Sequence, residues 1–305
     1  MTDPQAPRGT IYDLGYRHYE GPRLGRRYAV RSLVTLSLRS TFGLGRGALP
    51  KVLAFGLVLL AFVPAIAQVA IAAVGRGIFE VVEYADYFGL IQVIIVLFVA
   101  AMSSELVGND RRYHTLVLYF SRPIRRDDYV LSKITALALA LLCLTLGPQL
   151  LVYLGNWLGS SRGAGWIADH ASELLAIVAS SVLVSAQLAA IAVAIAMFSS
   201  RRAFALTSVL AVLLVTFIAA GTLVAVLDDP GWAAAVMLLT PLFVMRAVTL
   251  VLFDAVPAVS TFSHDQDPAD QIAFAGLPGW AWVAALVAQT ALAVAVAVLY
   301  YRRAS

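Results

Sequence analysis

The residues with the most recognisable chemistry lie in one charged stretch, residues 103–133, between two long apolar runs. It contains six Lys or Arg residues and reads SSELVGNDRRYHTLVLYFSRPIRRDDYVLSK. In its middle, the apolar run LVLYF separates two clusters of charge. Because exposed apolar side chains need a cover, the stretch predicts a contact surface for a cytoplasmic partner. The alternative is a solvated loop whose positive charges only set the orientation of the chain.

Residues suited to catalysis or metal binding are sparse. The four histidines, His18, His114, His170 and His264, fall in predicted loops, and none belongs to an H-E-x-x-H motif. Residues 264–270 offer carboxylate and imidazole ligands for a cation, but their spacing matches no specific metal-binding loop, so no metal site is predicted. The single cysteine, Cys143, forms no disulfide within the chain.

The sequence also lacks an energy source of its own. Its predicted spans contain no Asp, Glu, His, Lys or Arg, whereas ion-coupled transporters usually keep an ionisable group inside the membrane. The two lysines, Lys51 and Lys133, do not occur in a G-x-x-x-x-G-K-[ST] phosphate loop. Uphill movement would therefore need ATP hydrolysis on a separate chain. We expect no cofactor in this chain, and ATP with Mg in the partner.

Composition places the chain in the membrane. Of its 305 residues, 61% are hydrophobic and 13% are charged, against about 25% charged in soluble proteins, and the mean hydropathy is +0.84. The net charge of +4 does not indicate a nucleic-acid partner, because basic residues gather in cytoplasmic loops of membrane proteins. No cleavable signal is recognisable near the start.

Six apolar runs are long enough to span a bilayer, which takes about 20 residues per helix. The predicted spans are Val52–Val74, Tyr87–Ser104, Ile134–Gly155, Leu174–Phe198, Ala203–Leu227 and Trp280–Tyr301. The sequence thus predicts an all-α membrane protein with six transmembrane helices.

A seventh apolar run, Trp232–Phe253, contains Pro241 and Arg246 near its middle. A charge at the centre of a span costs about 2.5–3.5 kcal/mol on insertion scales. We therefore predict two short helices, broken near Pro241, that form a re-entrant element in the outer leaflet before the last span. With six spans and both termini in the cytoplasm, only Arg76, Arg162 and Arg246 of 22 basic residues lie outside.

The segment before the first span divides into two parts. Residues 1–25 are rich in Gly and Pro and predict no helix. Residues 26–42 have helical periodicity, with an apolar stripe on one face and Arg27, Arg31, Thr35 and Arg39 on another. This pattern predicts an interfacial helix in the headgroup plane, with membrane lipid as a partner. The alternative is a solvated helix whose apolar stripe packs on protein.

The charged stretch carries a family resemblance. It follows the order Glu105, Arg111, Arg112, Thr115, Leu116, Ser121, Arg122, Pro123, Ile124, Arg126, Tyr129, Lys133. This order resembles the first cytoplasmic loop of ABC-2 type permeases, the membrane subunits of ABC exporters. The chain has His114 where that family commonly has Gly. The opening residues IYDLGYRHYEGPRLGRR are similar to those of bacterial members.

The resemblance implies an ATP-driven exporter subunit in the cytoplasmic membrane of a bacterium. It implies dimerisation with a second permease copy, usually an identical one, and binding to two copies of a cytoplasmic ABC ATPase. A short coupling helix would contact the ATPase through Arg112, Tyr113, Thr115, Leu116, Tyr119 and Phe120. The expected parts are an N-terminal segment (1–50) and a transmembrane domain (51–305) with a coupling loop (103–133) and an extracytoplasmic region (228–279).

Polar residues inside the predicted spans are candidates for a substrate path. They are Gln92, Gln149, Gln187 and Ser185, with Arg246 at the outer rim. Each is also suited to hydrogen bonding between helices, and Arg246 could bind an anionic cargo, pair with Asp254 or contact a carbonyl. A path lined by aliphatic residues would suit an amphiphilic or hydrophobic substrate.

Two other functions are consistent with the same residues. One is a non-transporting assembly or sensory subunit that recruits a cytoplasmic protein through its basic loop. The other is an integral-membrane enzyme, which requires an essential ionisable cluster that the predicted spans do not contain.

Overall fold

The chain folds as a bundle of helices, and no strand occurs among the described residues. The computed structural model describes residues 21, 24–45, 47–75, 83–112, 119, 121, 124–160, 163–199, 201–227, 229–255, 271–273 and 275–303. The helices are α1 (Gly25–Thr41), α2 (Ala48–Gly75), α3 (Tyr84–Leu90), α4 (Gln92–Arg112), α6 (Arg126–Gly159), α7 (Ala164–Asp169), α8 (Ala171–Ala196), α9 (Arg202–Leu210), α10 (Thr216–Leu227), α11 (Pro230–Leu239), α12 (Pro241–Leu252) and α14 (Gly279–Arg303).

Five of the described helical units are long and apolar enough to cross a membrane. These are α2, α6, α8, the continuous unit Arg202–Val226, and α14. Two bent pairs, α3 with α4 and α11 with α12, qualify only when both members are counted together. The chain is therefore a multi-pass membrane protein with five to seven candidate spans, a range that includes the six predicted from the sequence.

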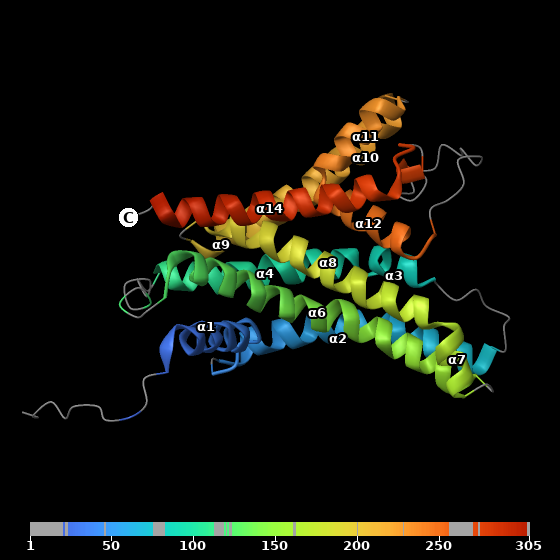
Figure 1. Cartoon of the computed structure of the whole chain (residues 1–305), viewed down its shortest axis with the longest axis horizontal. Coiled ribbons are helices and arrows are strands. Elements are labelled where there is room, and N and C mark those ends of the chain that lie inside the picture. The colour runs from blue at the N-terminus through green and yellow to red at the C-terminus, as the bar shows by residue number, and fades with distance from the viewer. Residues whose placement is uncertain are drawn as a thin grey trace, which may run out of the picture.

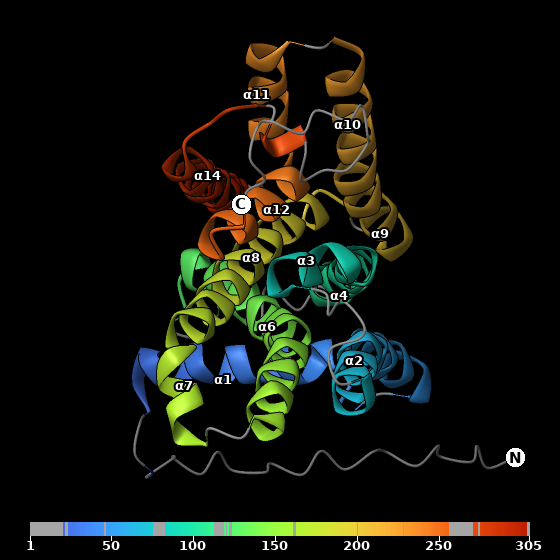
Figure 2. The same ribbon diagram turned by 90° about the vertical axis from the view of Figure 1, so that its right-hand side faces the viewer.

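Helix α6 is the centre of the bundle. It packs against α1, α2, α4, α8 and α14, as Figure 2 shows with the bundle seen from one end. Glycines allow α2 to approach closely, because a Cβ atom at Gly147 would lie 2.7 Å from Phe62 Cζ and one at Gly155 would lie 2.6 Å from Val69 Cγ2. Small residues at such contacts are typical of helix packing in membranes.

The second predicted span, Tyr87–Ser104, is divided between two helices. Helix α3 ends at Leu90, α4 begins at Gln92, and the two are bent by 55°. The bend is held against α2, since the Tyr87 hydroxyl donates a hydrogen bond of 2.6 Å to the carbonyl of Ala61.

The charged stretch 103–133 is helical and largely buried at both of its ends. Helix α4 continues to Arg112, and α6 already begins at Arg126. Glu105 and Lys133 are buried among these helices. Both ends of the stretch therefore belong to the helical bundle, where ion pairs compensate the buried charges.

The run Trp232–Phe253 is broken where its proline predicts. Helices α11 and α12 are bent by 103°, and Pro241, which has no N–H to donate, is the first residue of α12. Two glutamine side chains donate hydrogen bonds to backbone carbonyls at the break. Gln289 Nε2 donates to the Leu238 carbonyl at 2.8 Å, and Gln187 Nε2 to the Pro241 carbonyl at 3.3 Å.

Helix α1 lies across the bundle rather than along it. It is seen end-on in Figure 1 and lengthwise in Figure 2. Its buried residues, Leu33, Ser37 and Thr41, recur every four positions and lie on the side that packs against α6 and α4. The helix predicted at residues 26–42 is thus present at Gly25–Thr41.

The long helical unit Arg202–Val226 leaves the bundle partway along its length. Its first part, α9, packs against α4 and α8, whereas α10 packs against α11 and α12. A π-helical segment, Ala211–Val215, separates the two parts. Figure 1 shows α10 and α11 projecting from the rest of the helices.

Candidate functional site: the ion-paired end of the bundle

One end of the bundle gathers most of the ion pairs in the described chain. Helix α4 ends there, α6 begins there, α14 ends there and α1 lies alongside (Figure 1). We call it the ion-paired end, and define it by three ion pairs: Arg26–Asp128, Lys133–Asp110 and Arg302–Asp127. Each pair includes a residue from the first turns of α6, so this short part of α6 is joined to three other helices.

The pair between α6 and α4 is buried. Lys133 Nζ lies 2.6 Å from Asp110 Oδ2, and the two side chains are only 5% and 12% exposed. The Tyr129 hydroxyl donates a second hydrogen bond to the same aspartate oxygen, at 2.8 Å. Two donors therefore compensate one carboxylate between the last turns of α4 and the first turns of α6.

The other two ion pairs are more exposed. They join α6 to α1, the first described helix, and to α14, the last. Arg26 of α1 donates two hydrogen bonds to the Asp128 carboxylate, at 2.7 and 2.8 Å. The hydrogen bond with Asp128 raises the pKa of the Arg26 guanidinium. Arg302 of α14 likewise holds Asp127 through two donors. Such two-pronged contacts fix orientation as well as distance.

Neighbouring contacts extend this network. Arg126 donates to the carbonyl of Arg302 at 3.0 Å, at the last turn of α14. Arg202 of α9 lies 2.6 Å from the buried carboxylate of Glu105 in α4. Together with the three pairs defined above, these contacts connect α1, α4, α6, α9 and α14 at one end of the molecule.

Aromatic rings pack around the buried lysine. The ring of Tyr119 lies 5.8 Å from that of Tyr129, and the ring of Tyr301 lies 5.3 Å from it on α14. Lys133 Nζ is 5.4 Å from the centre of the Tyr129 ring and 6.0 Å from that of Tyr119. The part of the α4–α6 connection that includes Tyr119 is therefore in contact with the buried charges.

Only part of the predicted coupling contact falls within the described residues. Tyr113, Thr115, Leu116 and Phe120 lie outside them, and Arg112 is the last residue of α4. Tyr119 is half-buried against the bundle. The contact of these residues with an ATPase stays a prediction.

The predicted substrate-path residues are mostly buried between helices. Gln149 and Ser185 are buried, and the Ser185 hydroxyl lies 3.2 Å from that of Thr145. Gln187 bonds to Gln289 at 2.7 Å, in addition to its bond at the α11–α12 break. Gln92 is half-buried at the start of α4. A transport role for any of them stays a prediction.

Arg246 is held by the bent α3 helix. Its guanidinium donates to the Asp86 carboxylate and to the carbonyl of Ala85. Its side chain is only 8% exposed. Gly89 makes room for it, because a Cβ atom there would lie 3.2 Å from Arg246 Cζ. Of the alternatives weighed for Arg246, the carbonyl contact is therefore present, but the carboxylate is Asp86 rather than Asp254.

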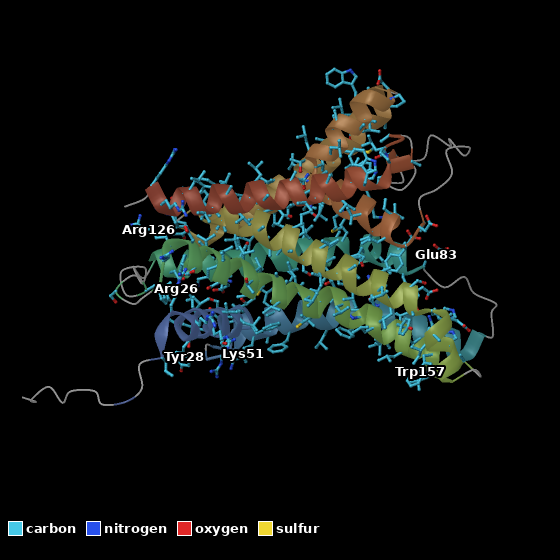
Figure 3. All side chains as sticks on the ribbon, in the orientation of Figure 1. Arg26, Tyr28, Lys51, Glu83, Arg126 and Trp157 are labelled. Carbon is cyan, nitrogen blue, oxygen red and sulfur yellow. The ribbon has the colours of Figure 1, made fainter. Side chains whose placement is uncertain are left out.

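The opposite end of the molecule has a cavity of about 360 Å³, lined in part by Glu83, Tyr84, Asn156 and Phe253. Figure 3 shows Glu83 at the end remote from Arg126. Within the described part of the chain, no three His, Cys, Asp or Glu side chains lie together as a metal site would require. The acidic stretch around His264 is outside the described residues.

The sequence prediction named the basic residues of stretch 103–133 and Glu105 but missed its three aspartates. Asp110, Asp127 and Asp128 are the partners on which the ion-paired end depends. Their position was a usable signal, since four acidic residues share this short stretch with six basic ones. What the sequence did not indicate was their partners, which lie on α1 and α14 for two of the three pairs.

These features define a multi-pass membrane protein in which most of the described ion pairs between helices lie at one end of the bundle. The chain belongs to the ABC-2 transporter family, since the model of the family described as "ABC-2 family transporter protein" matches residues 27–305. It is an ABC-2 type permease, as the resemblance in the charged stretch predicts. No curated protein and no solved structure gives a significant match to the chain.

Proposed function

We propose that this permease is the transmembrane subunit of an ATP-driven exporter, with ATP hydrolysed by a separate ABC ATPase subunit. The ion-paired end faces the cytoplasm, and the ATPase binds at the α4–α6 connection. The observation that carries the proposal is the three-way attachment of the first turns of α6 to α1, α4 and α14. The family match supports it, since such permeases normally work with an ATPase.

This attachment gives a route for mechanical coupling. A partner that displaces the α4–α6 connection acts on both helices to which it is joined. Because Lys133 is paired with Asp110 and Tyr129 is bonded to it, α4 and α6 move as a unit at this end. Binding of ATP then changes the relative populations of the inward-open and outward-open states of the permease. It does so because the ATPase binds the permease with a different affinity in each of these two states.

The proposed topology has six spans with both termini in the cytoplasm. Helices α3 and α4 together form the second span, and α11 and α12 form a re-entrant element in the outer leaflet. The bend angles support this distinction, since 55° still allows α3 and α4 to cross the membrane in one direction, whereas 103° leaves α12 nearly perpendicular to α11, so that the pair does not continue across. Helix α1 lies in the headgroup plane of the inner leaflet.

The working unit is a homodimer of the permease with two ATPase subunits. Its cargo is amphiphilic or hydrophobic and passes along the dimer interface. The many exposed apolar side chains of α2 and α10, such as Leu59, Ile66, Ile218 and Val226, support extensive contact with lipid or a second copy.

Co-purification tests the ATPase partner. The tagged permease should isolate a soluble protein with a phosphate loop, and Leu116→Glu should abolish this binding. Leu158→Glu is a matched control, because Leu158 is exposed at the opposite end of α6. Isolation of a partner without ATPase activity would instead support the non-transporting assembly or sensory subunit.

Cysteine labelling tests the orientation independently. In a Cys143→Ser background, Ser121→Cys should react only with reagent that reaches the cytoplasm. Ser172→Cys, at the start of α8, should react with an impermeant reagent added from outside. The reverse pattern would contradict both the orientation and the ATPase site.

A further inference from the structure

Helix α1 presents a row of arginines on its exposed side. Arg27, Arg31 and Arg39 are all exposed, and together with Thr35 they form a row with a spacing of four residues. None of the three has an ion-pair partner among the described residues, and α1 itself contains no acidic residue. They differ in this from Arg26, which is bound to Asp128. No described side chain therefore neutralises their charge.

The row lies on the side of α1 remote from the bundle. The buried residues Leu33, Ser37 and Thr41 define the side that packs against α6 and α4. At 100° per residue, the arginine row is centred more than 120° around the helix from that side. Figure 3 agrees, since it places Arg26 toward α6, and Tyr28 and Lys51 at the outer edge of the molecule.

Apolar side chains are interleaved with these cations. Tyr28 and Leu36 of α1, and Leu24 directly before it, are each more than half exposed. A surface that mixes guanidinium groups with exposed aromatic and aliphatic side chains fits the boundary between lipid headgroups and acyl chains, where the apolar parts enter the membrane and the cations remain at the phosphates. It fits open water poorly.

The direction of α1 places all three cations at one depth. The helix runs across the bundle axis (Figures 1 and 2), so its residues stay level with one another while the spanning helices pass through the membrane. Twelve residues separate Arg27 from Arg39, which is about 18 Å along a helix. A row of this length at constant depth matches a plane of headgroups.

We propose that Arg27, Arg31 and Arg39 form a binding site for anionic phospholipid headgroups of the inner leaflet, with Lys51 contributing from the start of α2. The proposal rests on the orientation given above but not on export or on ATP. Its ligand is a phosphodiester lipid that carries net negative charge. Binding stabilises α1 against α6, and therefore the ion-paired end to which α1 is joined through Arg26 and Asp128.

The test uses the full-length purified permease in detergent micelles mixed with phosphatidylglycerol or with phosphatidylcholine of the same acyl chains. Phosphatidylglycerol should raise the melting temperature, and salt should reduce the effect because it screens exposed charges. In Arg27→Gln/Arg31→Gln/Arg39→Gln the apparent affinity for phosphatidylglycerol should fall by about fivefold per arginine, or on the order of 100-fold in all. Native mass spectrometry should show correspondingly fewer retained phosphatidylglycerol molecules.

A matched triple variant, Arg125→Gln/Arg201→Gln/Arg303→Gln, removes the same charge from exposed positions at the same end of the bundle and should keep the response. The variant Arg27→Lys/Arg31→Lys/Arg39→Lys should also keep most of it, which separates loss of charge from misfolding. An undiminished response in the α1 glutamine variant, or equal loss in the matched variant, would overturn the proposal.

A third outcome concerns the other class of partner. If the α1 glutamine variant kept its lipid response but no longer bound the ATPase, the row would be a protein-binding surface and the lipid site would be rejected. If it lost the lipid response yet still bound the ATPase, the lipid site would stand whatever the transported cargo. Failure of the lipid site and failure of the exporter proposal are thus separate results.

Discussion

Lys133 and Asp110 form a 2.6 Å ion pair between α6 and α4, in side chains that are 5% and 12% exposed. Neither charge has more than slight access to water, so each depends on the other for compensation. The pair lies directly beside the connection at which we place the ATPase, and the Tyr129 hydroxyl completes it. The stability of the permease should therefore depend on keeping both charges or neither.

Removing one partner of this pair should be more harmful than removing both. Lys133→Met alone leaves a buried carboxylate, which we expect to cost about 3–5 kcal/mol of unfolding free energy. Lys133→Met/Asp110→Leu leaves no buried charge and should recover much of that loss. Thermal unfolding in detergent measures each variant. Tyr129→Phe keeps both charges and should have the smallest effect. If the losses from Lys133→Met and from Asp110→Leu were equal and simply added in the double variant, this account would be contradicted.

The Arg246 site should be sensitive to a methyl group on the neighbouring helix. Gly89→Ala brings a Cβ atom to 3.2 Å from Arg246 Cζ and should displace the guanidinium from Asp86. Arg246→Met removes the hydrogen bonds themselves, and we expect a loss of about 2 kcal/mol. Gly56→Ala is the matched control, because a Cβ there meets nothing within 4 Å. If Gly89→Ala lowered the melting temperature no more than Gly56→Ala, Gly89 would not be needed to accommodate Arg246.

Much of the fold was predictable because hydropathy and proline act locally. The helix near residues 26–42 and the break before Pro241 both follow from periodicity or from a missing N–H, and neither depends on distant contacts. The bend between Leu90 and Gln92 was not predicted, since no proline marks it and the contacts that hold it are distant in the sequence. Its stabilising contacts come from Ala61 and Arg246, both far away in the sequence.

The candidate site was predictable only as a charged stretch. The sequence indicated that residues 103–133 carry the cytoplasmic contact, but it gave no means of pairing their charges. Arg26 and Asp128 are 102 positions apart, and Arg246 bonds to Asp86 across 160 positions, whereas the sequence analysis considered the nearby Asp254. Pairing of buried charges depends on which helices are neighbours, and that is decided by packing along their whole length.

The close approach of α2 and α6 should not tolerate larger residues. A Cβ at Gly155 would lie 2.6 Å and 2.9 Å from the two methyl groups of Val69, so Gly155→Ala should cost about 1–3 kcal/mol through overpacking. This outweighs the gain of about 0.5–1 kcal/mol that alanine brings to a helix interior. Val69→Ala in the same chain should restore part of the loss. Melting temperatures decide the matter, and a stabilised Gly155→Ala variant would refute the proposed contact.

The two glutamines at the α11–α12 break should act as one unit. Gln289 donates to the Leu238 carbonyl and accepts from Gln187, which also reaches the carbonyl of Pro241. Gln187→Leu or Gln289→Leu leaves buried acceptors unpaired, and we expect about 1–3 kcal/mol of destabilisation from each. Since both changes disrupt the same network, the double variant should lose less than the sum of the two. Gln92→Leu, at a half-buried site outside this network, should change stability by at most about 0.5 kcal/mol. Strictly additive losses in a double-mutant cycle would mean that the two side chains support the break independently, and that each carbonyl depends on its own donor alone.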